Sequence, residues 1–323
     1  MWAIQIDVHG GPEVLQWREL PDPIAGPGQV VAEVGAAGLN FIDTYQRSGF
    51  YQVALPYVLG LEGAGTVVEV GDGVDHLGVG DRVAWATCPS SYAERVALSA
   101  AQVMRVPDGV SWDVAAAIPL QGMTAHFLAI DTFPLTAGDR CLVHAGAGGV
   151  GLLLIQIAKR VGAEVFTTVG TPAKAELAAA AGADHTILYD DVDFVEAVRE
   201  IAGEERPLDV VYDGVGRTVF RPSLTLIKMR GTMVTFGNAS GPVEPISPLE
   251  LSANGSLYLT RPTLFHHVTS RDEIQRRADD LFAWVADGSL DVRVGARYAL
   301  SDAADAHRAL EGRATTGKVL LEP

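Results

Sequence analysis

Cysteine and lysine are the scarcest informative residues of this sequence, and each shortage excludes something. Only Cys88 and Cys141 occur in 323 residues, and Cys141 lies in an apolar run that we expect to be a buried strand. Two cysteines exclude a disulfide framework and a four-cysteine structural zinc site. Only four lysines occur, so a lysine beside a candidate binding site carries more weight than usual. They are Lys159, Lys174, Lys228 and Lys318.

Long apolar runs and positive charge are also missing. No apolar run reaches the roughly 20 residues that a membrane-spanning helix needs, and the first residues show no basic segment followed by an apolar block. We therefore expect a cytoplasmic protein with no signal peptide and no membrane partner. The 24 basic residues are outnumbered by 40 acidic ones, for a net charge of −16, which argues against nucleic acid as a partner. Any anionic cofactor needs local positive groups.

The most informative segment is a glycine-rich turn between two apolar runs. The first run covers residues 141–144, an amphipathic run covers 152–160, and the second apolar run covers 165–169. Strand, glycine turn, helix and strand within about 30 residues predict a dinucleotide site. The turn consists of G-x-G-x-x-G spacing with one extra glycine, and its candidate residues are Gly146, Gly148, Gly149, Val150 and Gly151.

Each glycine of this turn has an expected physical role. The first, Gly146, lets the chain turn sharply out of the strand. The second, Gly148, leaves room for a pyrophosphate beside the backbone, and the third, Gly151, lets the helix pack close to the strand. The free N–H groups at the start of the helix then face the anion.

The rest of the chain is organised around this unit. Short β-branched or alternating runs with Gly and Pro clusters between them predict a partly open, β-rich barrel; they cover 30–34, 65–70, 82–86 and 92–98. Helical patterns at 112–117, capped by Ser111, and at 121–130 flank an interruption at Pro119. From residue 140 the chain alternates strands and helices in a six-stranded, doubly wound pattern. Its later elements are expected at 172–181, 185–188, 193–201, 208–212, 218–226, 233–236 and 256–259.

The C-terminal segment lacks this alternation and is expected to return to the first lobe. It contains a helix from Ser270 to about residue 287, a strand at 291–300, a helix at 303–310 and a terminal strand at 318–321. We therefore expect an α/β protein in which residues 1–122 and 265–323 form a catalytic, substrate-binding domain, and residues 123–264 form a nucleotide-binding domain.

The end of the second Rossmann strand predicts which dinucleotide binds. NAD sites usually carry Asp or Glu there to bind the ribose 2′-OH, but this strand ends in Gly170-Thr171, and Lys174 follows within one helical turn. An absent carboxylate and an added cation favour a 2′-phosphate, and hence NADP(H). Tyr189 ends the third strand, beside the expected adenosine ribose, and Phe236-Gly237 ends the fifth, where a Rossmann fold meets its ligand.

Several further segments carry a resemblance to a known family. They are GLNFID at 38–43 followed by Tyr45, Arg47 and Gly49, LGLEGAG at 59–65, HAGAGGVG at 144–151, 231–237, and RPTLFHHV at 261–268. Together they resemble the medium-chain dehydrogenase/reductase superfamily, most closely its zinc-free quinone oxidoreductase branch of zeta-crystallin-like enzymes. The resemblance implies a GroES-like lobe, a Rossmann domain, NADPH in the cleft between them, and usually a homodimer. It also places Thr124, Arg261 and Phe265 near cofactor or substrate.

The residues themselves argue against zinc. In the zinc alcohol dehydrogenases with this pattern, a cysteine stands at the position of Asn40 and a histidine at that of Leu61, and leucine cannot ligate zinc. We therefore expect no metal. Without a Lewis acid to stabilise an alkoxide, alcohol oxidation is disfavoured, whereas a quinone or enone delocalises incoming electrons and needs only hydrogen bonds to its oxygen.

The expected function is therefore zinc-independent reduction of quinones or related conjugated carbonyls by NADPH. Candidate polar groups are Asn40, which would orient the nicotinamide carboxamide or a cofactor hydroxyl, Tyr45 as a proton or hydrogen-bond donor, and Tyr51. Tyr45 could equally be an aromatic residue that closes the site, because a reduced quinone can take protons from water. One alternative is an NADPH-dependent enone, 2-alkenal or enoyl reductase of the same superfamily. Another is a non-catalytic NADPH-binding redox sensor or structural protein.

Overall fold

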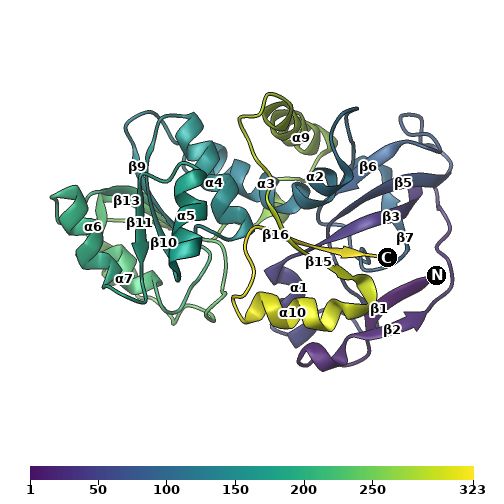
Figure 1. Cartoon of the computed structure of the whole chain (residues 1–323), viewed down its shortest axis with the longest axis horizontal. Coiled ribbons are helices and arrows are strands. Elements are labelled where there is room, and N and C mark those ends of the chain that lie inside the picture. The colour runs from purple at the N-terminus through teal and green to yellow at the C-terminus, as the bar shows by residue number, and fades with distance from the viewer. The chain divides into compact units, whose positions relative to one another are not determined.

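The computed structural model describes residues 1–323 and divides them into two compact units (Figure 1). Unit 1 contains Met1–Met123, His267–Gly288 and Val292–Pro323, whereas unit 2 contains Thr124–His266 and Ser289–Asp291. The chain therefore leaves unit 1, builds unit 2 and returns to unit 1. None of the helices combines the length and apolar character needed to cross a membrane.

Unit 1 is built on β3, which pairs antiparallel with β5, β7 and β16. The sheet that contains it has seven strands: β3 (Gln29–Leu39), β5 (Gly63–Val70), β6 (Arg82–Trp85), β7 (Arg95–Ser99), β8 (Val103–Arg105), β15 (Val294–Ala299) and β16 (Lys318–Glu322). A second sheet has three: β1 (Trp2–Ile6), β2 (Gln16–Glu19) and β4 (Tyr57–Val58). Because β3 and β16 are neighbours, the last strand of the chain lies beside the segment that leads to Asn40.

The helices of unit 1 begin and end where local sequence signals permit. Ser111 accepts a hydrogen bond from the Val114 N–H at the start of α2, and Ser270 with Glu273 forms a capping box at the start of α9, as the sequence predicts. The helices are α1 (Phe41–Ser48), α2 (Trp112–Ala117), α9 (Arg271–Ala286) and α10 (Ala303–Glu311), with short 3₁₀ turns at Pro12–Val14, Ala100–Gln102 and Leu300–Asp302. A further helix, α3 (Pro119–Phe127), runs from unit 1 into unit 2.

Unit 2 is a parallel, doubly wound sheet with strand order β11-β10-β9-β12-β13-β14. Figure 1 shows α4 and α5 on one face of this sheet and α6 and α7 on the other. The strands are β9 (Arg140–His144), β10 (Glu164–Val169), β11 (His185–Leu188), β12 (Leu208–Asp213), β13 (Ile227–Thr235) and β14 (Tyr258–Thr260). The helices are α4 (Gly149–Arg160), α5 (Pro172–Ala180), α6 (Phe194–Ala202), α7 (Phe220–Leu224) and α8 (Pro248–Ala253), with shorter turns at Leu128–Thr132 and Leu264–His266. The strand order reverses between β9 and β12, which is where this fold binds ligands.

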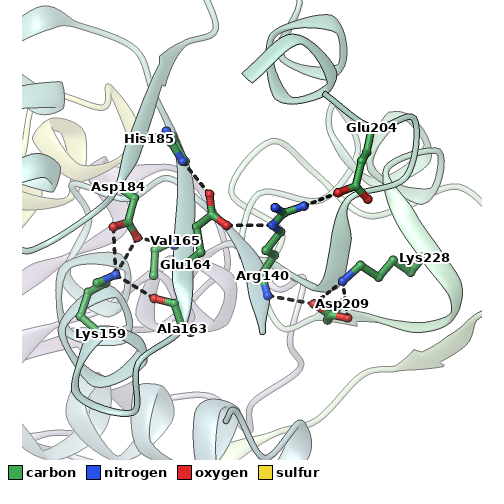
Figure 2. Close-up of polar contacts among 10 residues, drawn as sticks. All are labelled: Arg140, Lys159, Ala163, Glu164, Val165, Asp184, His185, Glu204, Asp209 and Lys228. Atoms are coloured by element: carbon green, nitrogen blue, oxygen red, sulfur yellow. Dashed lines mark hydrogen bonds and ion pairs between the residues drawn. The ribbon is translucent and has the colours of Figure 1, made fainter. Parts of the chain in front are cut away.

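Charged side chains gather at the amino ends of these strands (Figure 2). Arg140, the first residue of β9, pairs with Glu164 of β10 at 2.8 Å and with Glu204 at 2.7 Å. The Arg140 N–H donates to Asp209, whose carboxylate also pairs with Lys228. Burial alone would raise the pKa of Glu164, but hydrogen bonds from His185 and Arg140 outweigh it and lower that pKa. Two of the four lysines, Lys159 and Lys228, thus form ion pairs at this edge of the sheet, away from the glycine turn.

Three expectations about elements need correction. Residues 92–98 are not one strand, because β7 begins only at Arg95. Pro119 does not interrupt a helix but begins α3, a position that suits proline because it has no N–H to donate. The prediction of a β-rich segment over the first 120 residues did not include α1. Its signals were local: Asn40 as N-cap with Asp43 three residues later, and Gly49 with φ of 79° as C-cap.

Candidate functional site

The carboxyl edge of the unit 2 sheet brings together most of the predicted nucleotide-binding residues. The glycine turn follows β9, Gly170 and Thr171 follow β10, and Tyr189 follows β11. Phe236 and Gly237 follow β13, and Arg261 follows β14. Because the six strands are parallel, segments that leave their carboxyl ends meet at the same edge.

The glycine turn works differently from the sequence expectation at its first position. The left-handed residue is Ala145, with φ of 57°, and not Gly146. Gly146 is needed because a Cβ there would overlap Thr167 Oγ1 on β10. Gly151 does have its expected role: a Cβ would lie 2.8 Å from Gly146 Cα, so the start of α4 packs against the turn only without a side chain. Gly148 is the N-cap of α4.

Among Gly146, Gly148 and Gly151, Gly148 is the position where a Cβ would have the most room. Its nearest contact would be Ala145 O at 3.2 Å, so an alanine here requires this carbonyl to move by a few tenths of an ångström. A positive φ does not demand glycine here, and packing demands it less than at Gly146 or Gly151. This bare stretch of backbone and the N–H groups of Gly149 and Val150, which begin α4, form a cradle that suits the pyrophosphate of a dinucleotide.

The loops after β10 and β11 converge on Gly170. A Cβ at Gly170 would lie 2.7 Å from the Tyr189 hydroxyl oxygen, so the tyrosine ring lies against this glycine. Thr171 caps α5 by accepting a hydrogen bond from the Lys174 N–H at 3.3 Å, and the first turn of α5 contains no acidic residue. The sequence reading missed one group: the Asp190 carboxylate, whose Oδ2 would lie 3.3 Å from the same Gly170 Cβ. Its adjacency to Tyr189 was the available signal.

The loops after β12, β13 and β14 are linked by hydrogen bonds. Arg261 Nη1 donates to Thr235 O at 3.1 Å, and the Asn238 amide, turned so that its oxygen faces Arg261, accepts from Nη2 at 3.2 Å. Asp213 Oδ1 accepts from the N–H groups of Val215 and Gly216, so its carboxylate stabilises the turn that follows β12. Burial raises the pKa of Asp213 to about 6, although these N–H groups oppose the shift.

Two predicted residues of unit 2 lie elsewhere. Thr124 is a buried residue of α3, and Phe265 lies in the short turn after β14 with 42% of its surface exposed. Their roles toward cofactor or substrate stay predictions.

In unit 1, Tyr45 and Tyr51 belong to one aromatic cluster. The Tyr45 ring, on α1, meets Tyr51 edge-on at a centroid distance of 5.2 Å and Phe50 at 5.6 Å. Phe50 and Tyr51 stack at 5.3 Å, and they are 46% and 36% exposed. Phe41 extends the cluster at 6.2 Å from Tyr45. A partly exposed group of aromatic rings offers flat faces and hydroxyl groups, the chemistry that suits a planar conjugated carbonyl.

Asn40 lies inside a buried polar network that the sequence did not predict. Its side-chain amide donates to Glu62 Oε2 at 2.8 Å and to Gly38 O at 3.2 Å, and its oxygen accepts from Lys318 Nζ at 2.9 Å. Lys318 also pairs with Glu62, and both side chains are essentially fully buried. Burial lowers the pKa of Lys318, and the charge of Glu62 opposes that shift. The amide of Asn40 thus has partners on three sides, and its role toward a cofactor stays a prediction.

A second buried group, Asp43, holds the first turn of α1. Its Oδ2 accepts from the Asn40 N–H and from the Tyr92 hydroxyl, each at 2.8 Å, whereas its buried Oδ1 has no hydrogen-bond partner. Burial raises the pKa of Asp43 from 3.8 to about 7; the hydrogen bonds and the Lys318 charge oppose this shift, and the Glu62 charge adds to it. Asp43 stands in the GLNFID segment, but nothing in the sequence marked it as buried.

The side chains of the chain form no group of three or more His, Cys, Asp or Glu residues that could hold a metal ion. Leu61, which stands at a would-be ligand position, is a buried core residue. The positive charge beside Asn40 is instead an ammonium group, that of Lys318.

The two glycines of the turn should respond differently to alanine. Gly146→Ala forces an overlap with Thr167 and should destabilise the ligand-free protein by about 1–3 kcal/mol. Gly148→Ala should leave its thermal unfolding temperature nearly unchanged and weaken NADPH binding about tenfold or more, since the methyl group occupies the cradle. Thermal unfolding and fluorescence titration with NADPH check both. Unchanged NADPH affinity in Gly148→Ala would refute the cradle.

Asp43 should make stability fall with rising pH. Its folded-state pKa is raised, so its contribution is complete below about pH 4 and is lost as pH rises toward 7, at up to about 1.4 kcal/mol per pH unit. In Asp43→Asn the amide oxygen can still accept from Asn40 and Tyr92, but no charge forms. The variant should therefore gain stability relative to the wild type between pH 5 and pH 7.5 in urea unfolding. Asp108→Asn, at an exposed site, serves as control; parallel pH curves for wild type and Asp43→Asn would contradict the expectation.

Comparison with known proteins agrees with this geometry. Residues 26–129 match the family described as alcohol dehydrogenase GroES-like domain, and residues 149–284 match zinc-binding dehydrogenase. The chain is 44% identical over 323 residues to a quinone oxidoreductase of Pseudomonas aeruginosa, with 99% of each chain covered. It is 39% identical to a 2-haloacrylate reductase of Burkholderia, covering 99% of this chain and 98% of that one. The chain also resembles the crystal structure of Escherichia coli quinone oxidoreductase complexed with NADPH, with a TM-score of 0.98 and 42% identity over the full length of both chains. On this evidence the chain belongs to the medium-chain dehydrogenase/reductase superfamily, in its quinone oxidoreductase branch.

Proposed function

We propose that the protein is an NADPH-dependent quinone oxidoreductase that works without zinc. The observation that carries this proposal is the carboxyl edge of the unit 2 sheet, where a bare glycine cradle suits the pyrophosphate of NADP(H) and the Gly170–Lys174 segment suits its 2′-phosphate. Identity of 42–44% along the full chain to quinone oxidoreductases supports the acceptor class. We propose unit 2 as the NADP-binding domain and unit 1 as the acceptor-binding domain, in a cytoplasmic homodimer.

The residues of unit 2 that would hold the cofactor fall into three groups along the sheet edge. The glycine cradle and the start of α4 hold the pyrophosphate. Tyr189 lies where the adenosine ribose is expected, and Lys174 with the start of α5 attracts the 2′-phosphate. Further contacts are proposed for Thr124, Phe236, Gly237, Arg261 and Phe265. Bound NADPH supplies the reducing equivalents.

The residues of unit 1 act on the acceptor. The aromatic cluster of Tyr45, Phe50 and Tyr51 binds the flat ring system by stacking and edge contacts. A hydroxyl group of Tyr45 or Tyr51 donates a hydrogen bond to the carbonyl oxygen on which negative charge develops. Reduction of a quinone to the hydroquinone consumes two electrons and two protons, and solvent can supply protons to the oxygens as their charge develops.

An acceptor screen tests this function. With NADPH as donor, the protein should reduce ortho- and para-quinones, and Tyr45→Phe should lower kcat/KM by about 10- to 100-fold if its hydroxyl serves the oxygen. Steady-state oxidation of NADPH at 340 nm is the measurement, in buffer treated with a chelator to test zinc independence. Turnover of 2-alkenals or enoyl thioesters with none of quinones would overturn the choice. NADPH binding without any turnover would favour a non-catalytic protein.

The second candidate is reduction of an activated alkene. The 39% identical Burkholderia relative, a 2-haloacrylate reductase, favours this alternative because its name specifies a substituted acrylate as substrate. A carboxylate substrate needs a cationic partner, whereas the cluster around Tyr45 is aromatic. Including 2-chloroacrylate in the screen separates the two functions, and we expect it to be a poorer substrate than quinones.

The cofactor preference rests on two opposing charges near Gly170. Lys174→Ala should reduce the ratio of NADPH to NADH affinity, by about tenfold for a direct phosphate contact. Asp190→Asn should increase that ratio, because its carboxylate lies beside the same glycine and repels a 2′-phosphate. Titration of each variant with both nucleotides gives the ratios. A ratio that neither variant changes would contradict the placement of the 2′-phosphate.

A further inference from the structure

The ion pair between Glu62 and Lys318 is the most deeply buried pair of charges in unit 1. The side chains are 0% and 1% exposed, and they come from positions separated by 256 residues. Glu62 precedes β5, and Lys318 is the first residue of β16. Removing two charges from water is costly, and a sheet of this kind could pack with apolar residues instead. The pair therefore calls for an explanation beyond stability.

The contacts of the pair show what it holds. Both Glu62 Oε2 and Lys318 Nζ contact the amide of Asn40, from its nitrogen and oxygen sides respectively. Glu62 Oε1 accepts from the Leu120 N–H at 2.6 Å, in the first turn of α3. Asn40 in turn is the N-cap of α1, the helix that carries Tyr45. One ion pair thus joins β5, β16 and the starts of two helices.

The sequence makes room for this pair at Gly38. A Cβ at Gly38 would overlap Glu62 Oε2 and lie 2.6 Å from Lys318 Cε, although the φ of Gly38 is not positive. Glycine is needed there because of the pair and not because of the backbone conformation. Gly35, in the same strand, differs: its Cβ would meet nothing closer than Ala64 O at 3.5 Å.

We propose that Glu62 and Lys318 are positioning residues, which fix the amide of Asn40 and the first turn of α1 and thereby hold Tyr45 in place for the acceptor. This inference rests on the proposed function. The pair has no contact with the aromatic cluster among its hydrogen bonds, so it acts through Asn40 and the helix. The donors and acceptors around Asn40 are matched on both sides, which leaves its amide one favourable orientation.

Two variants disrupt the pair in different ways. Glu62→Gln combined with Lys318→Met removes both charges together, so neither is left buried without its partner. Gly38→Ala keeps both charges and displaces them sterically, and Gly35→Ala is its matched control in the same strand. The readouts are kcat and KM for a quinone, NADPH affinity by fluorescence titration, and hydrogen–deuterium exchange of the peptide that covers α1.

We expect both variants to raise KM for the quinone about tenfold, because a displaced Tyr45 misaligns the acceptor. NADPH affinity should change less than KM for the quinone, by about twofold, because all the cofactor candidates except Asn40 belong to unit 2. The α1 peptide should exchange faster, whereas the peptide that covers β9 and α4 should not change. Gly35→Ala should match the wild type in every readout.

Two results would overturn the proposal: unchanged exchange of α1 in both variants, or faster exchange of α1 with kcat and KM for the quinone as in the wild type. A wild-type protein that reduces no quinone defeats the proposed function instead. The exchange measurement does not depend on activity, so the two failures can be told apart.

Discussion

The buried pair of Glu62 and Lys318 is the interaction on which unit 1 depends. Either charge alone in that position would cost about 3–5 kcal/mol, because a buried ion without its partner keeps its desolvation penalty. Three further hydrogen bonds offset this penalty: Glu62 Oε1 accepts from the Leu120 N–H, Glu62 Oε2 accepts from the Asn40 amide, and Lys318 Nζ donates to the Asn40 amide oxygen. Its members come from near the two ends of the chain. Unit 1 can therefore complete this site only after the segment that follows unit 2 has returned and β16 has paired with β3.

The two edges of the unit 2 sheet differ in composition: paired charged side chains lie at one edge and glycines at the other. At the amino ends of the strands, Arg140 and Lys228 are neutralised by Glu164, Glu204 and Asp209. At the carboxyl ends, bare backbone replaces side chains at Gly148 and Gly170. In a parallel sheet, the helices that follow the strands begin at the carboxyl edge, and their free N–H groups favour an anion there. The ion pairs of charged side chains lie at the opposite edge.

Much of this fold could be predicted from the sequence because its signals are local. β11 spans the expected residues, and Ser111 and Ser270 cap the helices predicted for them. The positions of the candidate nucleotide-binding residues could be predicted from the order of strands and helices, because each of these segments follows a parallel strand. The network around Asn40 could not be predicted in this way. Its partners lie 22 and 278 residues away, and no periodicity links residues that meet only through the return of the chain. Within the turn, the sequence predicts that Gly146 lets the chain turn sharply, whereas the residue with positive φ is Ala145, which has no sequence signature for that conformation.

The acidic character of the protein makes the local charges near Gly170 decisive. With a net charge of −16, the long-range field repels an anionic dinucleotide, and only short-range groups can reverse that repulsion. The start of α5 supplies partial positive charge through its N–H groups, and Lys174 adds a full one. The negative charge of the Asp190 carboxylate, which lies beside Gly170, opposes this attraction. A 2′-phosphate carries nearly two negative charges, so it gains more from the cation and loses more to the carboxylate than a 2′-hydroxyl does. We therefore propose that the preference for NADPH over NADH depends on Lys174 and Asp190 and not on the overall charge of the protein.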